Sequence, residues 1–257
     1  MTRPSAVAVA VAIGTVALSV LTGCTGDTPE PPPTPTAVDL EHLPDDLADY
    51  GNGLWLLTGA EAADEVVAAV RAAGAVRYSG RFTELTEPAP DVEPVTGRSL
   101  GVDFAGTPSG YTATLFTDEL RAEIIAVDGL TYLRGNDAYA ARAGLPELAA
   151  GYVCTTGDDD LVDEWAPLLR PADLVGSLLG ASDSIAVGEP RGDDATLEIV
   201  VGAGEAPAGI LRVQRSGPPL PATFTAGDAS GDGTFTFESW GQPFDVAAPT
   251  DVVRDCA

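Results

Sequence analysis

Residues 99–134 read SLGVDFAGTPSGYTATLFTDELRAEIIAVDGLTYLR, and the predicted fold is built around them. Apolar and polar residues alternate in it as successive rows. The apolar members of the rows are Leu100, Val102 and Phe104, then Tyr111, Ala113 and Leu115, then Leu120, Ala122, Ile124 and Ala126. Alternation with a period of two is typical of strands with one buried and one wet face, and Asp128-Gly129 between apolar runs is a strong hairpin signal. The stretch therefore predicts an antiparallel meander.

Strands and helices are also predicted on both sides of the meander. Alternation predicts further strands at residues 76–86, 130–134, 196–201, 211–213, 222–224 and 234–238. Capping residues and terminating glycines predict helices at residues 58–74 (with Thr58 and Glu61 as a capping box), 137–143 (capped by Asp137), 161–169 (capped by Asp160) and 171–179. The total is about ten short strands and four helices. A long antiparallel sheet with one apolar face must curl around something apolar, so we expect an α+β fold in which the sheet encloses helices or a ligand.

Charge and residue usage exclude several classes of function. The chain has 39 acidic and 13 basic residues, a net charge of −26, and its summed field repels nucleic acid. The one histidine is His42, and lysine is absent, so the sequence offers neither a metal site with several imidazoles nor a Schiff base. Phosphate-binding and nucleophile-elbow motifs are absent as well. We expect a protein that is not an enzyme and needs no cofactor.

The N-terminus has the features of an export signal. Arg3 precedes an uncharged apolar run at residues 6–20, and residues 21–24 read LTGC, which resembles the bacterial lipobox. The resemblance implies a signal peptide at residues 1–23 and lipidation, including palmitate, on Cys24; the alternative is an ordinary secretory signal with a stray cysteine. Residues 24–39 are Pro-rich and predict a flexible tether, followed by a single domain at residues 40–257. We expect anchoring to the extracytoplasmic face of the cell membrane.

The other two cysteines are Cys154 and Cys256. In an oxidising compartment the two thiols are predicted to form a disulfide; the alternative is a pair of reduced buried thiols. Two acidic clusters are weighed as calcium sites. Asp228, Ser230, Asp232 and Gly233 match early positions of a calcium loop, but Ser239 stands where a bidentate Glu is required. A hairpin turn explains this cluster better, and helix capping explains Asp158, Asp159, Asp160, Asp163 and Glu164, so no metal is predicted.

Apolar residues on several predicted elements are candidates for the lining of a ligand cavity. They are Val66, Val70, Leu115, Tyr132, Leu174, Leu178, Phe224, Phe235 and Phe237. For each of them the alternative is an ordinary core position. A curled sheet with an apolar concave face is a setting in which ligand pockets occur, and Tyr132 and Trp240 carry polar groups suited to a cavity mouth.

Several features together resemble the LppX/LprG family of actinobacterial envelope lipoproteins, which are similar in fold to the LolA lipoprotein carriers. They are the lipobox, the strand VRYSG at residues 76–80, the hairpin at residues 125–132, the apolar helices after it, and the run from WGQP at residues 240–243 to residues 248–249. The resemblance covers roughly residues 59–253. It implies a strongly bent half-barrel of antiparallel strands, with helices on its concave face and an apolar cavity for acyl chains. The disulfide and the extreme acidity depart from the family pattern.

Two hypotheses of function follow. The first is a membrane-anchored protein that binds or carries a lipid or glycolipid in an apolar cavity, without catalysis. The alternative is an interaction or sensory envelope lipoprotein whose core is filled and whose acidic surface contacts an envelope protein partner.

Overall fold

The meander predicted from residues 99–134 is the middle of the sheet. The computed structural model describes residues 51–86, 95–156, 165–202, 207–227 and 233–256. Its central strands are β2 (Val95–Thr107), β3 (Gly110–Phe116), β4 (Arg121–Val127) and β5 (Leu130–Gly135), each antiparallel to the next. Asp128 and Gly129 have φ angles of 53° and 78°, the left-handed values that a two-residue hairpin turn requires. The turn sets Val127 opposite Leu130, so that Ile124 pairs with Leu133.

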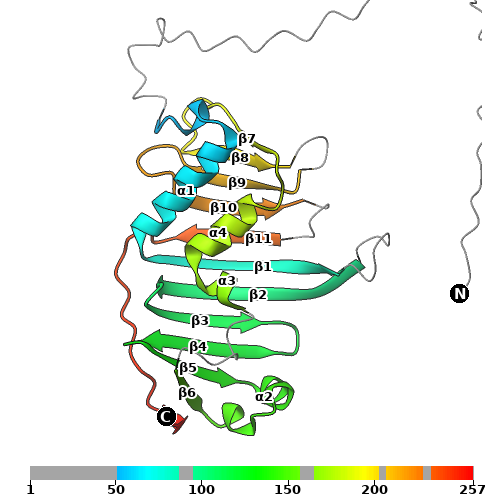
Figure 1. Ribbon diagram of the computed structural model, residues 1–257, viewed down its shortest axis with the longest axis vertical. Helices are drawn as coiled ribbons and strands as arrows, with labels where there is room; N and C mark the ends of the chain where they lie inside the picture. Colours follow the sequence, from blue (N-terminus) through cyan, green and yellow to red (C-terminus); the bar gives the residue numbers. More distant parts are fainter. Residues whose placement is uncertain (1–50, 87–94, 157–164, 203–206, 228–232, 257) are drawn as a thin grey trace, which may run out of the picture. The chain divides into compact units, whose positions relative to one another are not determined.

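The described strands form one sheet made of two meanders that meet along β1 and β11 (Figure 1). The first meander runs from β1 (Val76–Thr86) through β5 to β6 (Tyr152–Thr156), and β12 (Val252–Arg254) lies beyond β6. The second consists of β7 (Ile185–Val187), β8 (Thr196–Val201), β9 (Gly209–Gln214), β10 (Pro221–Ala226) and β11 (Gly233–Glu238). Every neighbouring pair is antiparallel except β12 and β6, which are parallel.

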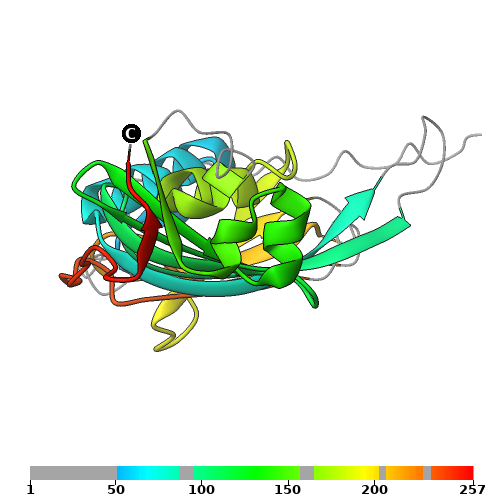
Figure 2. The ribbon, with the colours of Figure 1, turned by 90° about the horizontal axis from the view of Figure 1, so that it is seen from below.

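The helices lie on one face of the sheet, and the sheet curves toward them (Figure 2). Between the two meanders the chain crosses this concave face through α3 (Ala166–Leu169) and α4 (Pro171–Leu179), and α4 packs against α1 (Gly59–Ala73). The shorter elements are η3 (Leu54–Leu56), α2 (Asp137–Ala143) and η4 (Pro146–Ala149). The prediction of a strongly curved antiparallel sheet with helices on its concave face is confirmed.

Local sequence signals explain where the helices begin and end. Thr58 and Glu61 form the predicted capping box before α1, and the hydrogen bonds that Thr58 donates hold the pKa of the Glu61 carboxyl below its ordinary value. Pro171 lies in the first turn of α4, which ends at Gly180 as predicted. The predicted cap of α2 was wrong by one residue: the side chain of Asn136, not Asp137, accepts the hydrogen bond from the Tyr139 amide, at 2.9 Å.

The core lies between the concave face and the helices. Every second residue of the strands points into it, as in β8, where Leu197, Ile199 and Val201 are almost completely buried. Large rings lie directly over the backbone where the sheet has glycine. A Cβ atom at Gly80 would collide with the ring of Phe235, so glycine at that position is required by close packing.

The count of about ten strands was too low, because the described residues contain twelve. The strands that were missed are β6, β7 and β12. The latter two have three residues each, too few to show alternation. Several predictions fall on residues outside the described ranges: the signal peptide, Cys24, the tether, His42, the acidic cluster at residues 158–164 and the acidic residues of the turn at 228–232. The predicted helix 161–169 is described only from residue 165.

Candidate functional site

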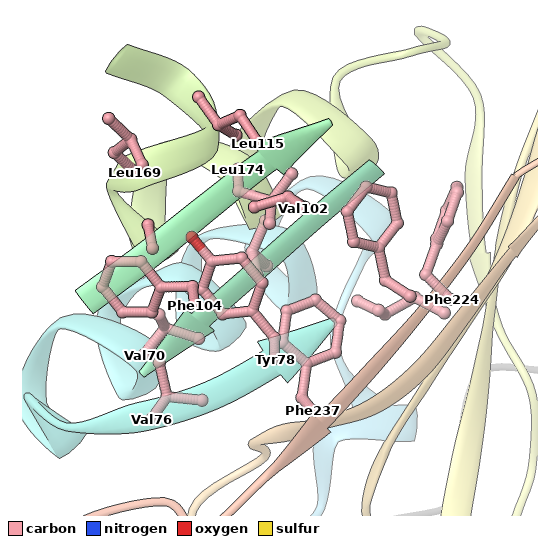
Figure 3. Close-up of a cluster of buried hydrophobic side chains, with 14 of the residues drawn as sticks. Val70, Val76, Tyr78, Val102, Phe104, Leu115, Leu169, Leu174, Phe224 and Phe237 are labelled. Atoms are coloured by element: carbon pink, nitrogen blue, oxygen red, sulfur yellow. The ribbon is translucent and has the colours of Figure 1, made fainter. Parts of the chain in front are cut away.

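A row of aromatic rings crosses the concave face over the neighbouring strands β3, β2, β1 and β11. Figure 3 shows its middle part, Phe104, Tyr78 and Phe237. The distances between ring centroids along the row are 5.1 Å for Tyr111–Phe104, 4.7 Å for Phe104–Tyr78, 5.7 Å for Tyr78–Phe237, 6.3 Å for Phe237–Phe235 and 6.1 Å for Phe235–Phe82. These spacings lie in the range of favourable aromatic pairs. The row gives the concave face a continuous apolar surface that runs from β3 to β11.

Tyr78 connects the row to the helical layer. Its side chain is 1% exposed, and its hydroxyl donates a hydrogen bond to the carbonyl oxygen of Leu168 in α3. Burial raises the pKa of the Tyr78 phenol, with Tyr111 as a smaller cause, so the phenol stays neutral and remains a donor. The hydrogen bond therefore fixes α3 over the sheet.

An apolar pocket of about 230 Å³ lies beside this anchored helix, between α4 and the strands β1, β10 and β11. It is lined by Phe82, Thr83, Leu168, Leu174, Ser177, Leu178, Ala181, Phe224, Ala226, Gly233 and Phe235. The polar side chains among them are the hydroxyls of Thr83 and Ser177, and none of these described lining residues is charged. Such a lining provides no charged partner for an ion, and it suits a hydrocarbon group.

The volume limits the size of a group that the pocket could hold. Sites for drug-sized molecules enclose roughly 300–1,000 Å³, and an apolar cavity of about 150 Å³ is large enough to bind benzene. At about 230 Å³ the pocket lies between the two. It matches one hydrocarbon segment in size, and not a whole lipid with several chains.

The structure divides the predicted cavity residues into three groups. Leu174, Leu178, Phe224 and Phe235 line the pocket. Val66, Val70, Leu115 and Phe237 do not line it; they are 0%, 2%, 3% and 5% exposed and belong to the packed core between helices and sheet. For these four the ordinary core interpretation holds.

Tyr132 was assigned to the wrong face of the sheet. It pairs with Ile125 and Cys154, whereas the next residue, Leu133, pairs with Ile124 and is completely buried on the concave face. Because successive side chains of a strand point to opposite faces, Tyr132 faces the outer side and cannot line the pocket.

Sequence reasoning missed other lining residues, including Phe82, Leu168, Ser177 and Ala181. Phe82 had a usable signal, since it lies four residues after Tyr78 on the same strand and so on the same face. Ser177 and Ala181 gave none, because small and polar residues near the end of a helix carry no sign of a cavity.

The fold has a solved counterpart of low similarity. It resembles LprF from Mycobacterium bovis. That crystal structure matches with 13% sequence identity and a TM-score of 0.39, over 73% of this chain and 94% of the LprF chain. No known family model matches the sequence, and no curated protein sequence does.

The outer face of the sheet has a different character. A hollow of about 520 Å³ over the middle strands is lined largely by polar side chains, among them Arg77, Asp103, Thr114 and Glu238. Ion pairs join other positions on this face, such as Arg212 and Glu198, whose charged atoms lie 2.8 Å apart on opposed residues of β9 and β8. Such exposed pairs contribute at most about 1 kcal/mol each. Among the described residues that line this hollow, the outer face therefore carries mostly polar side chains.

The C-terminal segment runs from the end of β11 to the edge strand β12. The indole of Trp240 donates a hydrogen bond of 2.7 Å to the carbonyl of Pro221 and stacks on Phe237, so Trp240 is not at the pocket mouth. The chain then reaches β6, where Cys154 and Cys256 are placed as a disulfide pair with Cα atoms 4.8 Å apart. This is the pairing that the cysteine count predicts.

Neither a metal site nor a membrane span is found in the described part of the chain. No group of three or more His, Cys, Asp or Glu side chains there could hold a metal ion. None of its helices combines the length and the hydropathy needed to cross a bilayer.

Proposed function

We propose that this chain is a lipid-anchored protein of the extracytoplasmic membrane face that holds the hydrocarbon part of a lipid or lipid-like ligand, without catalysis. The observation that carries the proposal is the apolar pocket between α4 and β1, β10 and β11. The lipobox-like residues 21–24 support the anchor and the compartment.

The binding mechanism is burial of apolar surface. Each methylene that leaves water contributes about 0.8 kcal/mol, so a short segment of chain is held without polar recognition. Phe224 and Phe235 form a rigid wall on the sheet side, while Leu174 and Leu178 contact the ligand from α4. The remainder of a larger ligand lies outside this pocket, because its volume of about 230 Å³ holds only a segment.

Native mass spectrometry tests the pocket. The full chain, produced in an actinobacterial host and purified, is expected to carry a bound lipid in addition to its own covalent modification. Ser177→Trp places a large ring in the pocket from an exposed position of α4, and is expected to lower the bound fraction at least fivefold. Ala68→Trp is the matched control, because Ala68 is an exposed helical residue of α1 that does not line the pocket.

A second candidate function has its own supporting observation. Val66, Val70, Leu115 and Phe237 fill much of the space between helices and sheet, as expected for an interaction or sensory lipoprotein with a packed core. Under this alternative both tryptophan variants and the parent chain emerge without bound lipid. Bare protein in all three samples would therefore reject the lipid-binding proposal.

The anchor is tested separately by metabolic labelling with palmitate. Labelling of the parent chain is expected, and Cys24→Ser is expected to abolish it. Label that persists in Cys24→Ser, or a parent chain without label, would reject the anchor and leave the pocket experiment unaffected.

A further inference from the structure

Large apolar side chains are exposed at two places in the described part of the chain. One is the end of η3 at residues 55–57, here called the apolar tip, where Leu56 is 44% and Leu57 39% exposed beside Trp55, which is half-buried and packs against the core. The other is Val253, which is 48% exposed. The apolar tip is the one of the two in which neighbouring residues form a continuous apolar patch.

The apolar tip is fixed in position by the residues around it. Leu54, directly before it, is 2% exposed and packs into the core. The amide N of Asn52 donates to the carbonyl of Arg215 at 2.7 Å, and its side-chain amide donates to Gln214 at 3.0 Å and Gly217 at 3.1 Å. The exposure of Leu56 and Leu57 is therefore built into a bonded turn.

The path of the chain indicates what the apolar tip contacts. The proposed anchor and the tether predicted at residues 24–39 precede Gly51, the first described residue, which lies four residues before Trp55. Among the described residues, the apolar tip is thus the exposed apolar patch that comes first in the chain. Val253 lies on β12, at one end of the strand order, whereas Asn52 at the entry bonds to Gln214 of β9, near the other end.

We infer that the apolar tip inserts into the surface of the membrane that carries the anchor, so that the domain rests on the bilayer at residues 55–57. The inference rests on the lipid anchor of the proposed function. Tryptophan suits the boundary between headgroups and acyl chains, and the two leucines bury their side chains below it. Because the tether makes insertion an intramolecular step at high effective concentration, a patch of this small size is sufficient.

The chemistry of the contact is apolar. A chain with a net charge of −26 is repelled by anionic lipids, so attraction between basic residues and headgroups does not supply the binding. Insertion is accordingly expected to be independent of salt concentration, in contrast to the docking of a basic patch.

Tryptophan fluorescence provides the test. The full lipidated chain is reconstituted in phosphatidylcholine vesicles with or without bromine on the acyl chains, which quenches nearby indoles. Trp55 is one of three tryptophans, so brominated lipid is expected to remove up to about a third of the emission, and Trp55→Phe is expected to abolish this loss. The double variant Leu56→Ser with Leu57→Ser is expected to reduce the quenching at least twofold.

Val253→Ser is the matched control, because it removes a side chain of comparable exposure at the opposite sheet edge. It is expected to leave the quenching unchanged. Co-flotation of protein and vesicles without quenching of Trp55 would overturn the inference and leave the anchor intact. Absence of co-flotation would overturn the anchor and, with it, the inference. Quenching that falls with added salt would show a different contact and overturn the inference. The same would follow if Val253→Ser reduced the quenching as much as the double variant Leu56→Ser with Leu57→Ser.

Discussion

Removal of one oxygen atom tests whether the layer of helices is held by Tyr78. In Tyr78→Phe the ring and its stacking on Phe104 at 4.7 Å are retained, and only the hydroxyl that donates to Leu168 is lost. The carbonyl of Leu168 in α3 is then left without this donor. The variant therefore separates the hydrogen bond from the packing of the ring.

The expected loss of stability follows from these contacts. A protein hydrogen bond contributes about 0.5–1.5 kcal/mol net, and a buried acceptor left unpaired costs about 1–3 kcal/mol. Leu168 is only half-buried, so water partly replaces the lost donor. We expect the free energy of unfolding to fall by about 1–2 kcal/mol. In a domain of this size each kcal/mol lowers Tm by about 2–4 °C.

Urea unfolding followed by tryptophan fluorescence measures the difference, with the disulfide kept oxidised. Tyr132→Phe is the control, because it makes the same chemical change in a half-buried tyrosine on the outer face. We expect this control to change stability by less than about 0.5 kcal/mol. Equal effects of the two variants, or an effect of Tyr78→Phe below about 0.3 kcal/mol, would refute the role assigned to the Tyr78 hydroxyl.

Three further outcomes are expected. Burial raises the pKa of the Tyr78 phenol above its ordinary value of about 10. The free energy of unfolding is therefore expected to be retained below pH 10 and to fall as the pH rises above it, less steeply in Tyr78→Phe. Urea titrations at pH 8–11 measure this fall. Cys154→Ser is expected to lose up to about 4–5 kcal/mol of unfolding free energy, since the pair closes a loop of 102 residues; calorimetry with and without reductant checks it. Gly80→Ala is expected to cost about 1–3 kcal/mol and to weaken lipid retention, because its Cβ displaces Phe235 from the pocket wall. Unchanged melting of Gly80→Ala would contradict the close approach of ring and backbone.

The central meander was predictable because its strands are wet on one face. In β4 buried residues alternate with half-buried or exposed ones along the whole strand, and in β3 they do so from Thr112 to Phe116, as the alternating rows predict. In β6 the same reasoning fails because Tyr152, Val153 and Cys154 are all buried. Val153 is buried toward the helices, and the other two lie beneath neighbouring side chains and the C-terminal segment. A strand covered on both faces shows no alternation.

The candidate site could be predicted only in part, and the error at Tyr132 was avoidable. The row predicted for β4 already places Ile124 on the apolar face with Ala122 and Ala126. The two-residue turn at Asp128 and Gly129 carries this face into β5, since it places Val127 opposite Leu130 and hence Ile124 opposite Leu133. By contrast, the pocket depends on the gap between α4 and the sheet, which no local pattern records.

The pairing of Cys154 with Cys256 has a consequence for how the protein withstands proteolysis. The bond turns residues 154–256 into a covalent ring that contains α3, α4 and all five strands of the second meander. One peptide bond cut anywhere within this ring leaves both new ends attached to the same molecule. Outside the cell, where thiols are oxidised and proteases are encountered, a nicked copy therefore keeps the second meander and both helices beside the pocket joined to the strands that precede them.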